Sequence, residues 1–147
     1  METITLTPAQ HDNLVELISK RRKLAIALMI VGLIGLFPPV IHIFSGGTYA
    51  YSAPGLVFLI IGILYQTQAD NAAKILKGDQ PEIFQTKCLK TSWLGHVRVE
   101  NNLQLSKEVK KPTKAIEYLG TIKATQVGDD IGILPIEKDF LAFPLNV

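Results

Sequence analysis

The sequence is poor in cysteine and, over one long stretch, has no charge at all. Cys88 is its only cysteine, so no disulfide can form within the chain and a secreted disulfide scaffold is excluded. Residues 24–69 contain no Lys, Arg, Asp or Glu, although charged residues make up 19% of the chain. At that frequency these 46 residues would carry about nine charges. The pattern therefore predicts that the 147 residues do not form a water-soluble single domain.

The uncharged stretch divides into two apolar segments around a turn. Leu24–Phe44 comprises 21 residues and Ala53–Ala69 comprises 17. The eight residues between them, Ser45–Ser52, include two glycines and two tyrosines, which is typical of an exposed turn with interfacial aromatic side chains. A membrane-spanning helix needs about 20 apolar residues. We therefore predict an integral membrane protein with a two-helix transmembrane hairpin.

Basic residues flank the predicted hairpin on both sides. Lys20, Arg21, Arg22 and Lys23 precede it, and Lys74 and Lys77 follow it. The positive-inside rule then places both termini in the cytoplasm, with the bacterial inner membrane, or an organelle membrane of bacterial descent, as the most economical location. A cleaved signal peptide is the rival interpretation. The length of the first apolar segment and the presence of a second one disfavour it.

The segment before the hairpin, residues 1–23, is predicted to form an amphipathic helix. Thr7-Pro8-Ala9-Gln10 combines a capping hydroxyl, a first-turn proline and a glutamine at the third position, which is the capping-box pattern. Apolar residues then share one face at helical spacing, and the helix is expected to end within residues 20–23. Such a helix either packs on the rest of the protein or lies on anionic lipid.

Three kinds of residue stand out within the apolar segments. Pro38 and Pro39 predict a kink in the first helix, because proline lacks an N–H and clashes with the preceding turn. His42 lies near the end of that segment, where an interfacial role is favoured over ligation of a haem. Small residues let helices approach closely, so we predict helix packing, within the hairpin or between copies, at four glycines: Gly32, Gly35, Gly55 and Gly62.

Residues 24–78 therefore form the predicted hairpin with a short helical extension that ends near Gly78, and residues 79–147 form a second domain. This domain has nine basic and nine acidic side chains, so it lacks the basic face of a nucleic-acid-binding domain. Short strands are predicted at Glu82–Thr91, Leu94–Glu100, Leu103–Ser106, Ile116–Val127, Ile131–Ile136 and Phe140–Leu145. They are expected to form a small, mainly β cytoplasmic domain, either a barrel or a curled antiparallel sheet.

One hairpin in this domain allows a prediction of register. A three-residue loop at residues 100–102 would pair Val99 with Leu103 and Val97 with Leu105. This register gives one apolar face, which Trp93 would extend. A second turn is predicted at Gly128-Asp129-Asp130.

The domain shows little sign of catalytic chemistry. Cys88 has lysines nearby, but its place on an alternating strand favours a structural cysteine over a nucleophile. Asp129 and Asp130 are adjacent in a turn, where their carboxylates point in different directions and no third acidic ligand follows. No phosphate-loop, dinucleotide-binding or metalloprotease motif occurs. We therefore expect no enzyme activity, no catalytic residue, no cofactor and no metal.

One loop is strongly basic, with Lys107, Lys110, Lys111 and Lys114 against a single glutamate. It is either a solvated surface loop or, together with the basic residues 20–23, a contact for anionic lipid or an acidic partner.

The function predicted from these features is a membrane-anchored accessory, assembly or regulatory protein, whose β domain docks on a larger membrane-protein complex. The alternatives are a homo-oligomeric channel or transporter-like assembly, and a sensor of anionic lipid. The predicted partners are thus the lipid bilayer, another membrane protein or further copies of the chain, and not nucleic acid.

Overall fold

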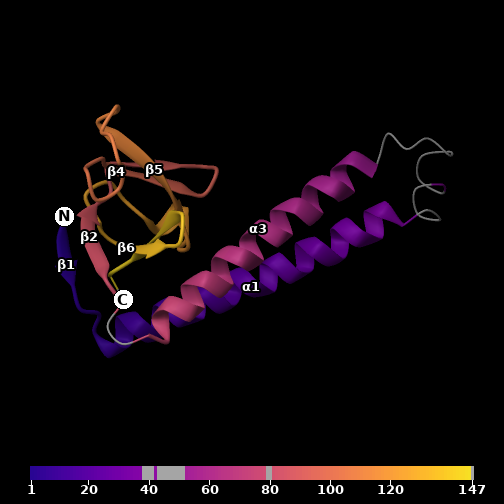
Figure 1. Cartoon of the computed structure of the whole chain (residues 1–147), viewed down its shortest axis with the longest axis horizontal. Coiled ribbons are helices and arrows are strands. Elements are labelled where there is room, and N and C mark those ends of the chain that lie inside the picture. The colour runs from indigo at the N-terminus through magenta and orange to yellow at the C-terminus, as the bar shows by residue number, and fades with distance from the viewer. Residues whose placement is uncertain (38–41, 43–51, 79–80, 147) are drawn as a thin grey trace. The chain divides into compact units, whose positions relative to one another are not determined.

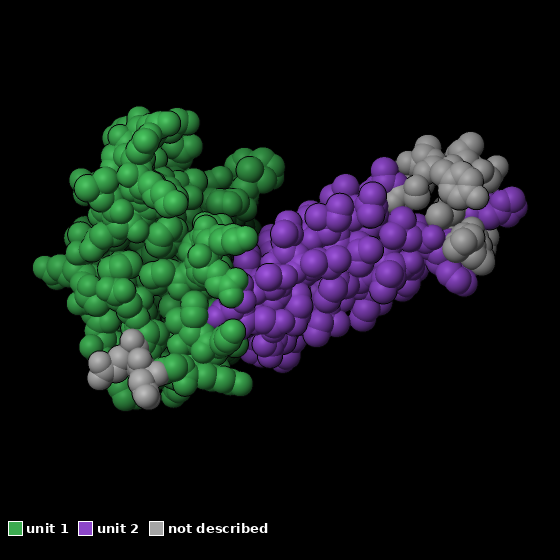
Figure 2. All heavy atoms as spheres, viewed as in Figure 1, with its two compact units in different colours: residues 1–17, 72–147 green, residues 18–71 purple. Residues whose placement is uncertain are grey.

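A computed structural model describes residues 1–37, 42, 52–78 and 81–146 of the chain. They form two compact units: residues 18–71 make one, and residues 1–17 with 72–147 make the other (Figure 2). The elements in chain order are β1 (Glu2–Ile4), α1 (Pro8–Leu36), α3 (Ser52–Leu76), β2 (Ile83–Lys87), β3 (Lys90–Ser92), β4 (His96–Glu100), β5 (Thr113–Tyr118), the 3-10 helix η2 (Ile122–Ala124), β6 (Asp130–Ile136) and β7 (Asp139–Pro144).

Helix α1 begins at the predicted capping box. The backbone N–H of Gln10 donates to Thr7 Oγ1 at 3.3 Å, and the backbone N–H of Thr7 donates to Gln10 Oε1 at 3.0 Å. Two N–H groups at the helix start are satisfied in this way. The predicted end within residues 20–23 is wrong, since α1 continues to Leu36. Lysine and arginine are good helix formers, so a basic run does not by itself terminate a helix.

The prediction of a transmembrane hairpin is also wrong. In residues 1–37, 42, 52–78 and 81–146, no helix has both the length and the apolarity needed to cross a membrane. The apolar part of α1 covers only Leu24–Leu36, whereas a span needs about 20 residues. Polar side chains already begin in α3 at Gln66, ten residues before its end. The predicted integral-membrane fold class, its transmembrane character, its inner-membrane location and its cytoplasmic termini are therefore not supported.

Helices α1 and α3 lie side by side in Figure 1, and within residues 18–71 their backbones meet at glycines. A Cβ added to Gly32 would lie 2.6 Å from Leu59 N and 2.8 Å from the carbonyl oxygen of Gly55. One added to Gly62 would lie 2.9 Å from the carbonyl oxygen of Ala25. Any larger residue at these positions would force the two helices apart.

Within the part of the chain that the structure describes, the second unit contains a seven-stranded mixed sheet in the order β1-β2-β6-β7-β5-β4-β3 (Figure 1). Neighbouring strands are antiparallel except β5 and β7, which are parallel. The predicted β domain is therefore present, but its sheet is not wholly antiparallel. Strand β1, which the sequence pattern did not indicate, pairs Thr3 with Phe84 of β2.

The predicted register around residues 100–102 is wrong. Val99 pairs with Lys114 and Val97 pairs with Ile116, because β4 is followed in the sheet by β5 and not by residues 103–106. Residues 103–105 form a turn instead of a strand. Asn102 holds this turn with its side-chain Oδ1, which accepts from the backbone N–H groups of Gln104 at 3.0 Å and Leu105 at 3.2 Å. Such hydrogen bonds from an asparagine side chain to nearby backbone N–H groups compete with the backbone hydrogen bonds of a strand.

The apolar core of this unit lies within the curled sheet. The side chains of this buried cluster come from β2, β4, β5, β6 and β7, and Cys88 and Leu105 join them from the connecting segments. β2 also contacts β4, although three strands separate the two in the sheet order. The core is therefore enclosed between opposite parts of one curled sheet.

Candidate functional site

The turn between β3 and β4 holds the most exposed large apolar side chain reported for the described residues. Trp93 is 89% exposed and its neighbour Leu94 is 62% exposed. The sequence pattern predicts that Trp93 extends the apolar face of a hairpin, whereas in the structure Trp93 lies at the tip of a turn. A tip position leaves the indole without neighbours from the core.

This turn is fixed by hydrogen bonds on both sides. The N–H of Gly95 donates to the carbonyl of Ser92 at 3.1 Å, and Gly95 has a φ of +82°, a conformation that glycine adopts without strain. The carbonyl of Gly95 accepts from the N–H of Tyr118 in β5 at 2.9 Å. The turn that carries Trp93 is thus tied to the sheet.

Trp93 directly follows the strand at one edge of the sheet. β3 is the outermost strand in the described sheet order, and it contains only Lys90, Thr91 and Ser92. An outermost strand presents backbone groups that no further strand of the same sheet pairs. This outermost strand ends at Ser92, directly before Trp93 in the chain.

A separate groove of about 660 Å³ opens beside the turn between β6 and β7. Its lining combines apolar side chains with three lysines and three carboxylates. One of these lysines, Lys114, donates to the carbonyl of Leu105 and lies 4.6 Å from the centre of the Phe140 ring. Its charges are balanced in number and Lys114 is already engaged, so the groove has no strong preference for ligands of one charge.

Cys88 is fully buried, which agrees with a structural role. Burial raises the pKa of its thiol, and the nearby Asp129 carboxylate raises it further, while the backbone hydrogen bond with Lys90 has an opposing effect. A nucleophilic cysteine needs a lowered pKa and access to substrate. Cys88 has neither.

Asp129 and Asp130 are both engaged by their own chain. Asp130 accepts from Lys87 Nζ at 3.1 Å, and this hydrogen bond is the main reason why the pKa of its carboxyl is lowered. Asp129 Oδ2 accepts from the backbone N–H of Gln126 at 2.8 Å. Among the described residues there is also no cluster of three or more His, Cys, Asp or Glu that would hold a metal ion.

The basic loop at residues 107–114 also directs part of its charge toward its own chain. Lys110 Nζ lies 3.1 Å from Glu108 Oε2. Lys114 contacts Leu105 and Phe140, as described above. Two of the four lysines proposed from the sequence as partner contacts therefore have intramolecular partners, and the other two, Lys107 and Lys111, are exposed.

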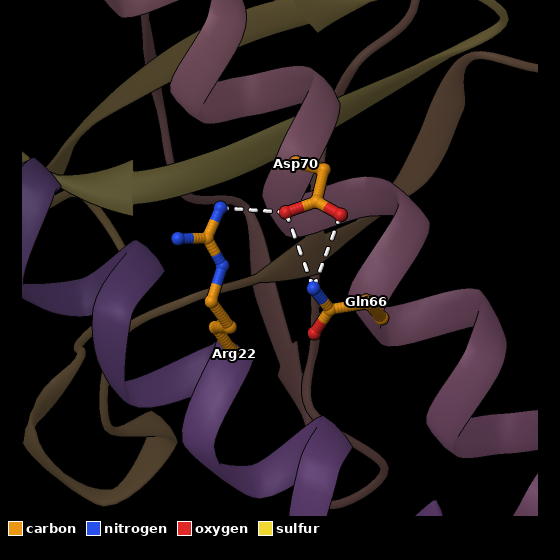
Figure 3. Close-up of polar contacts among 3 residues, drawn as sticks. All are labelled: Arg22, Gln66 and Asp70. Carbon is orange, nitrogen blue, oxygen red and sulfur yellow. Dashed lines mark hydrogen bonds and ion pairs between the residues drawn. The ribbon is translucent and has the colours of Figure 1, made fainter.

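The basic residues 20–23 lie inside α1, where two of them contact α3. Arg22 Nη2 donates to Asp70 Oδ1 at 2.5 Å, and the amide of Gln66 donates to both carboxylate oxygens of Asp70 (Figure 3). The guanidinium of Arg21 lies 3.8 Å from the centre of the Tyr65 ring. These residues therefore join the two helices, a role that their flanking position in the sequence did not indicate.

The remaining candidates from the sequence are placed as follows. His42 is exposed. The predicted kink at Pro38 and Pro39 lies outside the described residues. The predicted turn at Ser45–Ser52 also lies outside them, except for Ser52, which begins α3. The surface feature that sequence reasoning missed is Trp93 as a turn residue. Gly95, two positions later, is the local signal for that turn.

These features bring an exposed tryptophan, the outermost strand β3 and a hydrogen-bonded turn together on the β domain. No protein-family model, curated protein or solved structure matches the chain.

Proposed function

We propose that the chain is a non-catalytic accessory protein whose β domain docks on another protein through Trp93. The observation that carries this proposal is the 89% exposure of that side chain on a fixed turn. Tryptophan is enriched at interaction hot spots, because its large rigid side chain excludes water at little cost in conformational entropy. The proposal retains the docking role predicted from the sequence, without the membrane anchor.

The partner that fits this site is a protein with an apolar pocket for the indole and an extended segment beside it. Leu94 extends the apolar contact, and the open edge of β3 offers backbone groups for strand addition. The turn is held by the hydrogen bonds of Gly95 to Ser92 and Tyr118, so little ordering is required on binding.

Trp93 is the only tryptophan in the chain, so its fluorescence reports on the site directly. The free protein is expected to show the red-shifted emission and the full iodide quenching of an indole in water. Emission that is blue-shifted and protected from iodide in the purified monomer would contradict the exposed turn on which the proposal rests.

The docking itself is tested by photo-crosslinking in the cells from which the gene comes. A photo-reactive amino acid at position 93 of the full chain is expected to capture one protein in a discrete adduct. The same probe at position 103, where Leu103 is 77% exposed on another loop, is the matched control and is expected to capture it far less.

The substitution Trp93→Ala should then weaken binding of the captured protein by at least about tenfold, since hot-spot truncations cost about 2 kcal/mol or more. Leu103→Ala should leave the affinity within about twofold. Equal affinity for the Trp93→Ala variant and the original chain would overturn the proposal.

A further inference from the structure

Residues 18–71, which we call the helical unit, carry an apolar surface that no other part of the unit covers. The large apolar side chains exposed on it come from both helices and from the residue that follows α1: Leu24, Ile26, Ile30, Val31, Leu33, Ile34, Phe37, Leu56, Val57, Phe58, Ile60, Ile63 and Leu64. Each is between 41% and 59% exposed. An apolar surface of this kind is rarely left open to water and marks an interaction site.

The closest approach of α1 and α3 is made at glycines and not at these side chains. Gly32 lies against backbone atoms of Leu59 and Gly55, and Gly62 lies against Met29 and the backbone of Ala25. Because the backbones already touch there, the large side chains project to the sides of the pair and away from it. The helical pair is thus a preformed element with an apolar exterior.

Seven of the exposed side chains fall on one side of the pair, which we call the seven-residue face. Along α1 and just beyond it, Ile26, Ile30, Leu33 and Phe37 follow i, i+4, i+7, i+11 spacing, and along α3, Leu56, Ile60 and Ile63 follow i, i+4, i+7 spacing. At 3.6 residues per turn, the stripe on α1 lies about 130° around the helix from Gly32. The stripe on α3 lies about 120° from Gly55 and Gly62, in the same rotational sense. In an antiparallel pair, such stripes lie on the same side.

We propose that the seven-residue face binds the same face of a second copy of the chain, which gives a four-helix bundle across a two-fold axis. Paired stripes at this spacing are the core pattern of such bundles. A two-fold interface places the same surface on both partners. This surface suits that arrangement because residues 24–69 carry no charge, so no like charges meet across it.

The size of the face indicates a reversible dimer. Helix α1 from Leu24 to Leu36 extends about 20 Å, and two adjacent helices are about 20 Å wide. The flat area is therefore about 400 Å² per copy, below the roughly 800 Å² per partner of a standard stable interface. Association should accordingly depend on concentration within the micromolar range.

The test is sedimentation equilibrium of the full chain in aqueous buffer across a wide range of concentrations. A reversible monomer–dimer equilibrium is the expected result. Leu33→Gln and Ile60→Gln place an amide in the seven-residue face, and each should raise the dimer dissociation constant at least tenfold. Far-UV circular dichroism should remain unchanged, since both residues are already about half exposed.

The matched control is Val31→Gln. Val31 is 53% exposed against 59% for Leu33, but it lies about 160° around α1 from Leu33, on the opposite side of the helical pair. This variant should dimerise as the original chain does. The Trp93→Ala variant should also dimerise normally, which separates this proposal from docking through the β domain.

Four results would overturn the inference. The first is a chain that remains monomeric at every concentration. The second is an equal weakening of association by Leu33→Gln and Val31→Gln, which would indicate unspecific apolar contact, and the third is the formation of undefined aggregates only. The fourth is flotation of a monomeric chain with phosphatidylcholine and phosphatidylglycerol vesicles that Leu33→Gln and Val31→Gln abolish alike, because lipid and not a second copy would then cover the surface.

Discussion

The two units distribute large and small residues in opposite ways. In the helical unit, glycines such as Gly32 and Gly62 lie inside the helix contact while Leu33 and Ile34 are exposed. In the β unit, Gly95 and Gly128 lie in turns with nothing within 4 Å of an added Cβ. Apolar strand residues such as Leu134 are buried, whereas the exposed large apolar side chains, such as Trp93, lie in turns and loops. Hydrophobicity therefore predicts burial along the strands but not along the two helices, where the closeness of the two backbones decides which residues are buried.

The largest difference between the two units is expected when the same substitution, Leu→Ala, is made in each. Leu134→Ala in β6 removes a fully buried side chain and should reduce the free energy of unfolding by about 2–5 kcal/mol. Leu33→Ala should change it by less than about 0.5 kcal/mol in the monomer, because that side chain is already largely in water. Urea unfolding followed by far-UV circular dichroism measures both, and equal losses would contradict the stated contrast.

The glycine contrast gives the next largest effect. Gly32→Ala places a Cβ against backbone atoms of α3, which cannot rotate away, and should destabilise the helical unit by about 1–3 kcal/mol. Gly35→Ala is the milder control, since its nearest contact is 3.2 Å, to the Cα of Gly55. In thermal unfolding, the melting temperature should be highest for the original chain, lower for Gly35→Ala and lowest for Gly32→Ala. The reverse ranking of the two variants would mean that the helices do not meet at Gly32.

The hydroxyl of Tyr118, in the β unit, is expected to make a smaller contribution to stability. Thr125 Oγ1 donates to the Tyr118 hydroxyl at 2.9 Å, so Tyr118→Phe should cost about 1 kcal/mol near neutral pH. Burial raises the pKa of Tyr118 above its ordinary value of 10.0. The stability linked to this shift is fully present below the unfolded-state value and is lost as the pH rises toward the folded-state value.

The original chain should therefore lose stability between neutral pH and about pH 11, and Tyr118→Phe should lose less over that window. Urea midpoints at both pH values provide the measurement. Some loss should persist in the variant, because the pKa of Cys88 is raised as well. Identical slopes for the two proteins would exclude Tyr118 as a source of the pH dependence.

The smallest effect is expected at the ion pair of the helical unit. Arg22 and Asp70 are about half exposed, so Arg22→Met should reduce stability by about 0.2–1 kcal/mol, and high salt should diminish the difference. Asp70→Asn should behave similarly, because Gln66 can still donate to the remaining amide oxygen. If the stability difference between Arg22→Met and the original chain grew with salt concentration, an electrostatic origin would be contradicted.

Sequence patterns predicted the local features and failed where tertiary contacts decided. Thr7 and Gln10 form the expected cap, because that signal lies within four residues. Hydropathy predicts a membrane location for residues 24–69, because it does not distinguish the apolar surface of a helical pair from a membrane-spanning helix.

Pairings over long sequence distances were also missed. β1 has only three residues, and its partner lies about eighty residues away, so no local periodicity marks it. At the candidate site, Gly95 marks the turn, but the exposure of Trp93 depends on the register of β3 against β4.

The pairing of Glu2 with Gln85 sets an order of events during synthesis. Residues 18–71, the whole helical unit, emerge from the ribosome before β2 does, so outside the ribosome β1 has no partner until β2 follows it. The apolar helical pair is therefore complete while the sheet is still a single short strand, because chains are made from the N-terminus at a limited rate. Early in its life the protein is expected to present its most apolar surface first, which makes that surface the main hazard for aggregation on the ribosome.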